Sequence, residues 1–85
     1  MSFTSYLNTI TLTAVYQALS ATSLIGTYTI TASPANAGNV TVKGSNGVDT
    51  VIVAGEWHKL ENVDLATISV KGTVSDLVTV IGETF

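Results

Sequence analysis

The chain has no cysteine, and only 11% of its 85 residues are charged. Without disulfides, burial of apolar side chains must supply almost all of the stabilisation, and the lack of cysteine is compatible with any redox compartment. A soluble domain usually has about a quarter of its residues charged, so this surface must be rich in hydroxyl groups instead. Because a solitary monomer normally has more surface charge, we expect other protein to cover part of it.

Basic residues are scarce as well. Lys43, Lys59 and Lys71 lie far apart in a chain of net charge −3, so no basic patch is available to neutralise phosphates, and nucleic acid is not an expected partner. Residues 1–8 lack the basic residues of a secretory signal, and no apolar run approaches the roughly 20 residues that span a bilayer. We therefore expect a soluble protein, made in the cytoplasm, with no membrane partner.

Threonine is abundant: the chain has fourteen, many alternating with β-branched or other apolar residues. Examples are the runs 9–13, 27–31 and 40–42. A period of two places the apolar side chains on one face of a pleated strand and the hydroxyls on the other. The pattern predicts an all-β protein.

Alternation and turn residues place eight short strands in one domain, residues 1–85. The expected strands are 7–13, 15–19, 24–32, 39–43, 50–53, 56–60, 67–71 and 77–81. Tight turns between short strands predict a compact antiparallel β-sandwich, jelly-roll-like, or else a small barrel. Helix is the weaker alternative for residues 13–21, and residues 64–66 are compatible with one helical turn.

Two patterns leave alternatives open. Residues 40–53 resemble residues 68–80 as strand, Lys-Gly turn and strand, which indicates either a duplicated hairpin or a chance likeness between hairpins. Residues 51–53 and 78–81 have apolar side chains on both faces, so each strand is covered twice. The second cover is either a neighbouring subunit or the loops of the same chain.

No residue pattern specifies a reaction. His58 is the only histidine, too few for a metal site of three or four ligands, and no nucleophile motif accompanies it, so we expect an exposed strand residue. The six carboxylates are scattered without a calcium-loop pattern. We expect Asp64 and Asp76 to cap their own turns, and we predict no cofactor, no metal and no enzymatic activity.

Aromatic residues are the candidate interface groups. Trp57, the only tryptophan, has polar neighbours, so it is either the centre of the core, which we favour, or an interface anchor. Four further aromatics lie near the chain ends or at element edges, where aromatics often mediate subunit contacts. They are Phe3, Tyr6, Tyr16 and Phe85.

Residues 24–82 contain a series of short motifs in a definite order. They are Gly38-Asn39-Val40-Thr41-Val42-Lys43-Gly44, Ala54-Gly55-Glu56-Trp57-His58, Val63-Asp64-Leu65-Ala66-Thr67-Ile68-Ser69-Val70-Lys71-Gly72-Thr73 and Val78-Thr79-Val80-Ile81-Gly82. The series resembles small all-β structural proteins encoded among the head and tail genes of tailed bacteriophages.

The resemblance implies a compact β-sandwich in the virion, as a capsid decoration or cementing protein or a head- or tail-associated one. It implies no catalytic residues, a homo-oligomer with a trimer favoured, and partners such as a major capsid protein. Residues 1–20 lie outside the resemblance and are a candidate oligomerisation or attachment segment. The alternative, from a different class, is a carbohydrate- or receptor-binding module, because β-sandwiches host many functions on their loops.

Overall fold

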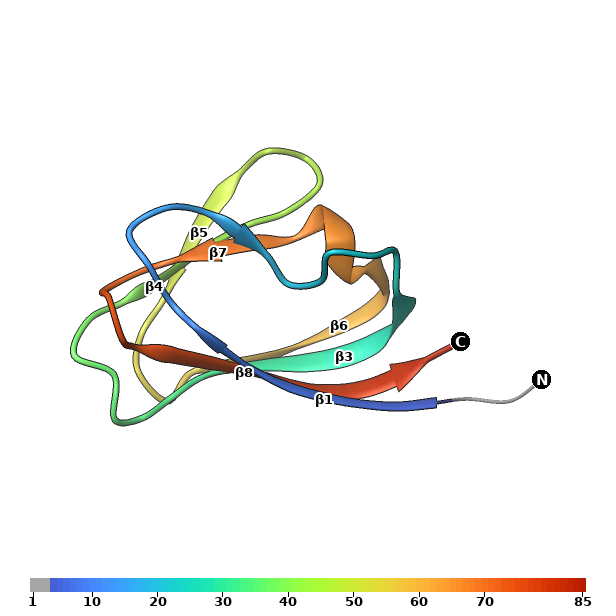
Figure 1. Ribbon diagram of the computed structural model, residues 1–85, viewed down its shortest axis with the longest axis horizontal. Coiled ribbons are helices and arrows are strands. Elements are labelled where there is room, and N and C mark those ends of the chain that lie inside the picture. Colours follow the sequence, from blue (N-terminus) through green and yellow to red (C-terminus); the bar gives the residue numbers. More distant parts are fainter. Residues whose placement is uncertain (1–3) are drawn as a thin grey trace.

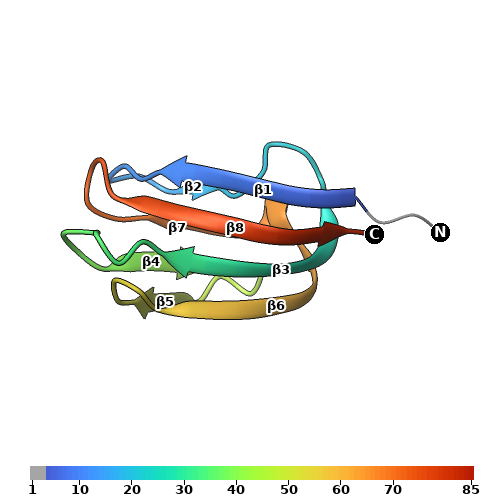
Figure 2. The same ribbon diagram turned by 90° about the horizontal axis from the view of Figure 1, so that it is seen from below.

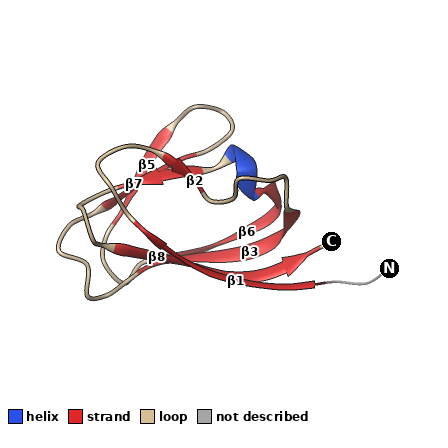
Figure 3. Cartoon of the chain, viewed as in Figure 1, coloured by secondary structure: helices blue, strands red, loops and turns tan. Residues whose placement is uncertain are grey.

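The computed structural model describes residues 4–85, which form two four-stranded antiparallel sheets facing each other (Figures 1 and 3). Sheet A has the strand order β1-β8-β3-β6 and sheet B the order β2-β7-β4-β5. The strands are β1 Thr4–Thr11, β2 Gln17–Ala18, β3 Ile25–Ala32, β4 Val40–Lys43, β5 Asp49–Ile52, β6 Trp57–Asp64, β7 Ser69–Lys71 and β8 Leu77–Thr84. The predicted all-β sandwich is confirmed.

The topology is that of a jelly roll. The first strand pairs with the last, β2 with β7, β3 with β6, and β4 with β5, all antiparallel. Only β4 and β5 are consecutive strands of one sheet; every other connection crosses between sheets. Two sheets of four strands wound in this way are the double-sheet arrangement of jelly rolls. This result selects the sandwich over the barrel.

The internal sequence likeness does not correspond to a structural repeat. β4 and β5 form a hairpin, closed by a turn in which the Gly47 amide donates to the Gly44 carbonyl and Gly47 has a φ of 79°. The corresponding strands of the second copy, β7 and β8, lie in different sheets. The likeness therefore reflects two similar strand-turn sequences and not a duplicated hairpin.

Alternation along the central strands of sheet A builds the core. In β3 and β8 the even-numbered apolar residues point inward and are buried, while the odd-numbered residues, half of them threonines, point outward. Residues from both sheets and from the connections complete the core. Its members are Leu12, Leu19, Tyr28, Ile30, Ala32, Val40, Ile52, Leu65, Ile68, Val70, Val78 and Val80.

Gly82 gives two tyrosines room to meet inside sheet A. In register it lies between Tyr6 of β1 and Tyr28 of β3, whose rings meet edge to face at 5.8 Å. A Cβ at Gly82 would lie 2.1 Å from the Thr27 carbonyl oxygen. Only glycine fits this close approach of β8 to β3.

The two capping aspartates have different roles. The Asp64 carboxylate accepts from the Ala66 amide at the start of the helical turn η1, Leu65–Thr67, as predicted. The prediction that Asp76 caps its own turn is wrong. Its carboxylate accepts from the amides of Ala37 and Gly38, at 2.9 and 3.0 Å, because the jelly-roll crossover places that distant loop against the start of β8.

The helical reading of residues 13–21 is also wrong, because this segment contains β2 and turns. The single turn at residues 64–66 does form, shifted by one residue as η1. Several strands are longer than predicted. β6 continues to Asp64 and β8 to Thr84, since β6 pairs with residues 25–31 of β3 and β8 with residues 26–32.

Candidate functional site

The predicted interface aromatics do not come together in one place. Tyr6 is half-buried against Tyr28, Tyr16 lies over sheet B, and Trp57 lies on the outer side of sheet A. Phe85 is exposed at the end of sheet A, where its amide donates to the Ile25 carbonyl. Phe3 lies outside the described residues. These aromatics therefore do not define a single interface.

The prediction that Trp57 is the centre of the core is wrong, since its side chain is 63% exposed. Trp57 and Leu60 are three residues apart on β6, so in a regular strand they face opposite sides. Leu60 pairs with buried Tyr28 and takes the inner side, whereas Trp57 pairs with Thr31 and takes the outer side. The spacing of these two residues shows in the sequence that they face opposite sides, but only the pairing with β3 shows which of them is inside.

The outer surface of sheet A faces solvent, and we call it the threonine face. Its residues occupy four neighbouring strands in register. They are Ser5, Leu7, Thr9, Thr11, Leu77, Thr79, Ile81, Glu83, Thr27, Thr29, Thr31, Trp57 and Lys59. One rank reads Thr9, Thr79, Thr31, Trp57 across the sheet, and the next reads Leu7, Ile81, Thr29, Lys59.

Apolar side chains interrupt the threonine face near its middle. Leu7 is 70% exposed and its neighbour Ile81 is 53% exposed, with Leu77 also exposed nearby. The charged side chains of the face are Glu83 and Lys59, at its margins, and the exposed Glu61 carboxylate lies 3.6 Å from the Lys59 ammonium. Hydroxyl groups and exposed aliphatic groups with so little charge form a surface that other protein can cover without desolvating ions.

Two segments were predicted to be covered on both faces, and the first of them, residues 51–53, lies at the edge of sheet B. Val51 and Val53 are both exposed there, and loops of the same chain do not cover them. Residues 78–81 are central in sheet A, where Ile81 is likewise exposed on the outer side. Within residues 4–85, loops of the same chain therefore cover the second face at neither place.

Two of the three lysines gather on the outer side of sheet B. Lys43 and Lys71 place their ammonium groups 4.3 and 4.6 Å from the centre of the Tyr16 ring. The Tyr16 hydroxyl donates to the Asp49 carboxylate at 2.6 Å, and this hydrogen bond, more than burial, raises the pKa of Tyr16. The carboxylate offsets one of the two positive charges, and the cluster ties β4, β5 and β7 to the segment before β2.

An apolar cleft of about 360 Å³ opens between the sheets on the side where β5 and β6 are the edge strands. Its interior includes core residues Ile30, Ile52 and Ile68, and its lining extends to His58 and to the β4–β5 turn, residues 44–48. The cleft is within the size range of small-molecule pockets, about 300–1,000 Å³.

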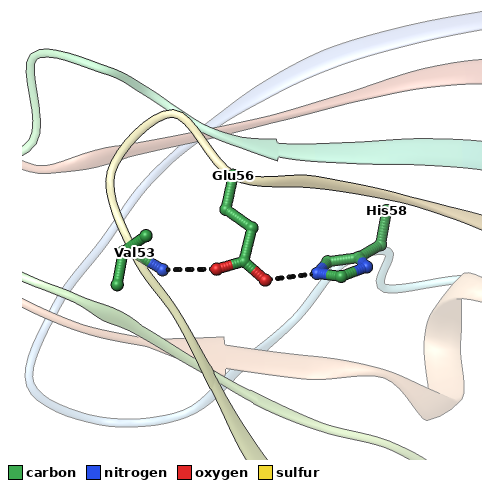
Figure 4. Close-up of polar contacts among 3 residues, drawn as sticks. All are labelled: Val53, Glu56 and His58. Carbon is green, nitrogen blue, oxygen red and sulfur yellow. Dashed lines mark hydrogen bonds and ion pairs between the residues drawn. The ribbon is translucent and has the colours of Figure 1, made fainter.

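His58 lies beside this cleft and contacts the Glu56 carboxylate (Figure 4). The other Glu56 oxygen accepts from the Val53 amide across the turn. The hydrogen bond from Val53, followed by that from His58, lowers the pKa of Glu56. The histidine side chain is 52% exposed, in agreement with the expected surface strand position.

Within residues 4–85, no three histidine or acidic side chains group together in a way that could hold a metal ion. In the same range, no helix has the length and apolar character required to cross a bilayer.

Comparison of the chain with family models, curated proteins and solved structures gave no match.

Proposed function

We propose that the protein is a non-enzymatic structural component of a tailed-bacteriophage virion, as a capsid decoration or cementing protein or a head- or tail-associated protein. It is made in the host cytoplasm and becomes part of the virion. The observation that carries the proposal is the threonine face, an extended and weakly charged surface with exposed Leu7, Leu77 and Ile81.

Covering such a surface with another protein lowers its free energy in water. Exposed apolar groups on neighbouring strands lose contact with water when another protein covers them, at about 25 cal/mol per Å² of apolar area. Threonine hydroxyls can exchange their water partners for hydrogen bonds with a facing protein, at a lower desolvation cost than ions. The threonine face therefore suits a permanent protein contact, such as one with a major capsid protein.

Two further considerations support the virion role. The order of motifs in residues 24–82 resembles bacteriophage structural proteins, and jelly rolls recur in viral capsid domains. Both are analogies, because one fold hosts many functions. The proposal assigns no catalytic role, cofactor, nucleic acid or membrane to the chain.

The test is mass spectrometry of virions purified from the phage whose genome encodes the chain. We expect the protein in the particle at a copy number related to the capsid or tail symmetry. A chain made in infected cells but missing from purified particles would overturn the proposal.

The contact surface is tested separately with Ile81→Lys, which places a charge in the middle of the threonine face. We expect this variant to be incorporated into virions at least tenfold less than the wild type. Val51→Lys, an equally exposed position on sheet B, is the matched control and should be incorporated normally. Equal incorporation of both variants would exclude the threonine face as the virion contact.

The carbohydrate- or receptor-binding module remains the second candidate because Trp57 is exposed. An exposed tryptophan ring can stack on a sugar, and here polar residues Thr31 and Lys59 lie beside it. Because Trp57 is the only tryptophan, its fluorescence reports directly on a ligand bound there. A saturable fluorescence change with a glycan, lost in Trp57→Phe at unchanged stability, would favour this candidate; no change across a glycan panel would reject it.

A further inference from the structure

Sheet A has two edges of equal length and different character. β1 lies at one edge and pairs only with β8, whereas β6 lies at the other and pairs only with β3 (Figure 2). Each has eight residues. An edge strand presents a row of unpaired backbone N–H and C=O groups, so it can receive a further strand unless something blocks it.

β6 has such blocks. Lys59 and Glu61 place charges along the strand, and their side chains lie 3.6 Å apart. Asn62 has a φ of 54°, and the register with β3 shifts between Gly26 and Tyr28, which marks a bulge. Charges and bulges are the devices by which natural proteins prevent pairing at a sheet edge.

β1 has none of them. Its sequence from Thr4 to Thr11 contains no charged residue, no proline and no glycine, and all eight of its residues pair with β8 in one uninterrupted register. The side chains on its outer side, such as Leu7 and Thr9, are exposed. Among residues 4–85, no strand lies beside the free edge of β1.

The hydrogen bonds between β1 and β8 identify which backbone groups of β1 point toward the free edge of the sheet. The Leu12 amide donates to the Asp76 carbonyl. In this register, therefore, the backbone N–H and C=O groups of the even-numbered residues of β1 point toward β8. In an antiparallel strand, alternate residues direct both backbone groups to the opposite side. Ser5, Leu7 and Thr9 therefore present their N–H and C=O groups to the free edge. The Thr11 carbonyl also points outward, but the Gln17 side-chain amide already donates to it at 3.1 Å.

We propose that β1 is the self-association edge of this protein and that its partner is β1 of a second copy, antiparallel across a twofold axis perpendicular to sheet A. This inference builds on the expected self-association of a virion component and names its surface. An axis perpendicular to sheet A keeps the outer faces of the two copies on the same side. Odd-numbered residues of one β1 therefore lie opposite odd-numbered residues of the other. The register with Leu7 opposite Leu7 and Ser5 opposite Thr9 uses all three outward residues of each copy, which makes about six backbone hydrogen bonds.

The competing register, with Leu7 opposite Thr9, places Ser5 of one copy opposite Thr11 of the other. The incoming Ser5 amide would then have to displace the Gln17 side-chain amide from the Thr11 carbonyl or share that carbonyl with it. The Leu7 register leaves Thr11 outside the pairing and brings two 70% exposed leucine side chains together at the axis. No charge is brought near another in this pairing, because β1 has none. The two copies then share one continuous eight-stranded sheet and a doubled threonine face. A twofold dimer, and not the trimer that the resemblance implies, is the assembly that this edge would form.

The first test is the mass of the protein in solution, measured by light scattering at about 50 µM. We expect twice the chain mass of 8.8 kDa. Leu7→Pro removes an N–H that faces the free edge and leaves the hydrogen bonds of even residues to β8 in place, so it should give a folded monomer. Ile81→Lys, on the adjacent central strand, is the control and should stay dimeric. A wild-type monomer, or a trimer whose mass Leu7→Pro does not change, would overturn the proposal.

The second test reads the register directly. The chain has no cysteine, so Leu7→Cys introduces the only thiol. Across the axis the two Cα atoms would lie about 5.5 Å apart, within the range that a disulfide bridges, about 4.4–6.8 Å. We expect oxidation to link the copies of this variant almost completely.

Thr9→Cys is the matched control for the register. Its two thiols would lie four residues apart along the strands, about 14 Å, and should not link. Mixing Ser5→Cys with Thr9→Cys should restore linking. Efficient linking of Thr9→Cys alone, or none for Leu7→Cys, would overturn the register and with it the proposed edge. Because both tests use the isolated protein, their failure is distinguishable from absence of the chain from virions.

Discussion

The two faces of sheet A are built from the same strands and differ only in the parity of their residues. The inner face contains Tyr28, Ile30, Val78 and Val80, each at most 2% exposed. The outer face is rich in threonine, and Leu7, Ile81 and Trp57 are exposed among the threonines. The side chains of the inner face therefore stabilise the fold, whereas the fold should tolerate substitution of the side chains of the outer face.

The largest effect is expected from Tyr28→Ala on the inner face. Tyr28 is 1% exposed, packs on Tyr6 and donates from its hydroxyl to the Leu24 carbonyl. Truncating a buried aromatic residue costs about 3–5 kcal/mol, enough to unfold a marginal domain of this size. Urea denaturation followed by circular dichroism measures this. A loss below about 1 kcal/mol would contradict the inner-face assignment.

Gly82→Ala should come next, because the added methyl group would meet the Thr27 carbonyl at 2.1 Å. The clash is with backbone, so relief requires β3 and β8 to separate. Overpacking of this kind typically costs about 1–3 kcal/mol. Thermal denaturation of this variant should show a clear loss, whereas Thr79→Ala on the outer side of the same strand should lose little. Equal losses of stability in the two variants would contradict the proposed difference between the inner and outer faces.

Acid should destabilise the fold through carboxylates at the two ends of β6. Hydrogen bonds from the Ser23 hydroxyl, then from the Ala66 amide, lower the pKa of Asp64, and the Leu24 amide adds to them against the effect of burial. The pKa of Glu56 is lowered as well. A lowered folded pKa means that this stabilisation is complete above the ordinary carboxyl value of about 4 and is lost as the pH falls through the folded values.

Melting temperatures measured from pH 6 down to pH 2 test this dependence. We expect the wild type to lose stability below about pH 4. Asp64→Asn should start less stable and show a shallower decline, because one of the titrating groups is gone. Parallel curves for the two proteins would contradict the role of Asp64.

The smallest effect is expected from Trp57→Ala. A large exposed side chain on the outer face contributes little to folding, so the change in unfolding free energy should be within about 0.5 kcal/mol. Chemical denaturation followed by circular dichroism, which does not depend on tryptophan fluorescence, provides the measurement. A loss of 3 kcal/mol or more would mean that Trp57 is buried in solution.

The sequence was sufficient for the fold class because Thr-Ile and Thr-Val alternation directly encodes which side chains of β3 and β8 point inward. It also located the Asn-Gly turn and the Asp64 cap, which are local features. It did not place Trp57, because β6 has polar residues on both sides and only pairing with Tyr28 selects Leu60 as the inner residue. The partners of Asp76 were out of reach for the same reason, since they lie 38 and 39 residues away.

The cluster around Tyr16 could not be predicted from the sequence either. Lys43, Lys71 and Asp49 belong to three different strands, and only the order of sheet B brings them to one aromatic ring. The threonine face was implied by the alternation, but its ranks depend on how β1, β8 and β3 are aligned. Properties that follow from one strand were predictable, and properties that need two distant strands were not.

The pairing of β1 with β8 also determines when the protein can fold. Residues Thr4 and Thr84 are 80 positions apart and lie opposite each other in sheet A. During synthesis β1 leaves the ribosome first and must wait for β8 before its ladder can form. The entropic cost of closing so long a loop precedes the contacts that offset it, so closure is slow. All-β domains dominated by such contacts fold in about milliseconds to seconds. Sheet A is therefore expected to fold only after β8 has left the ribosome, and until then β1 has no partner strand with which to form its ladder.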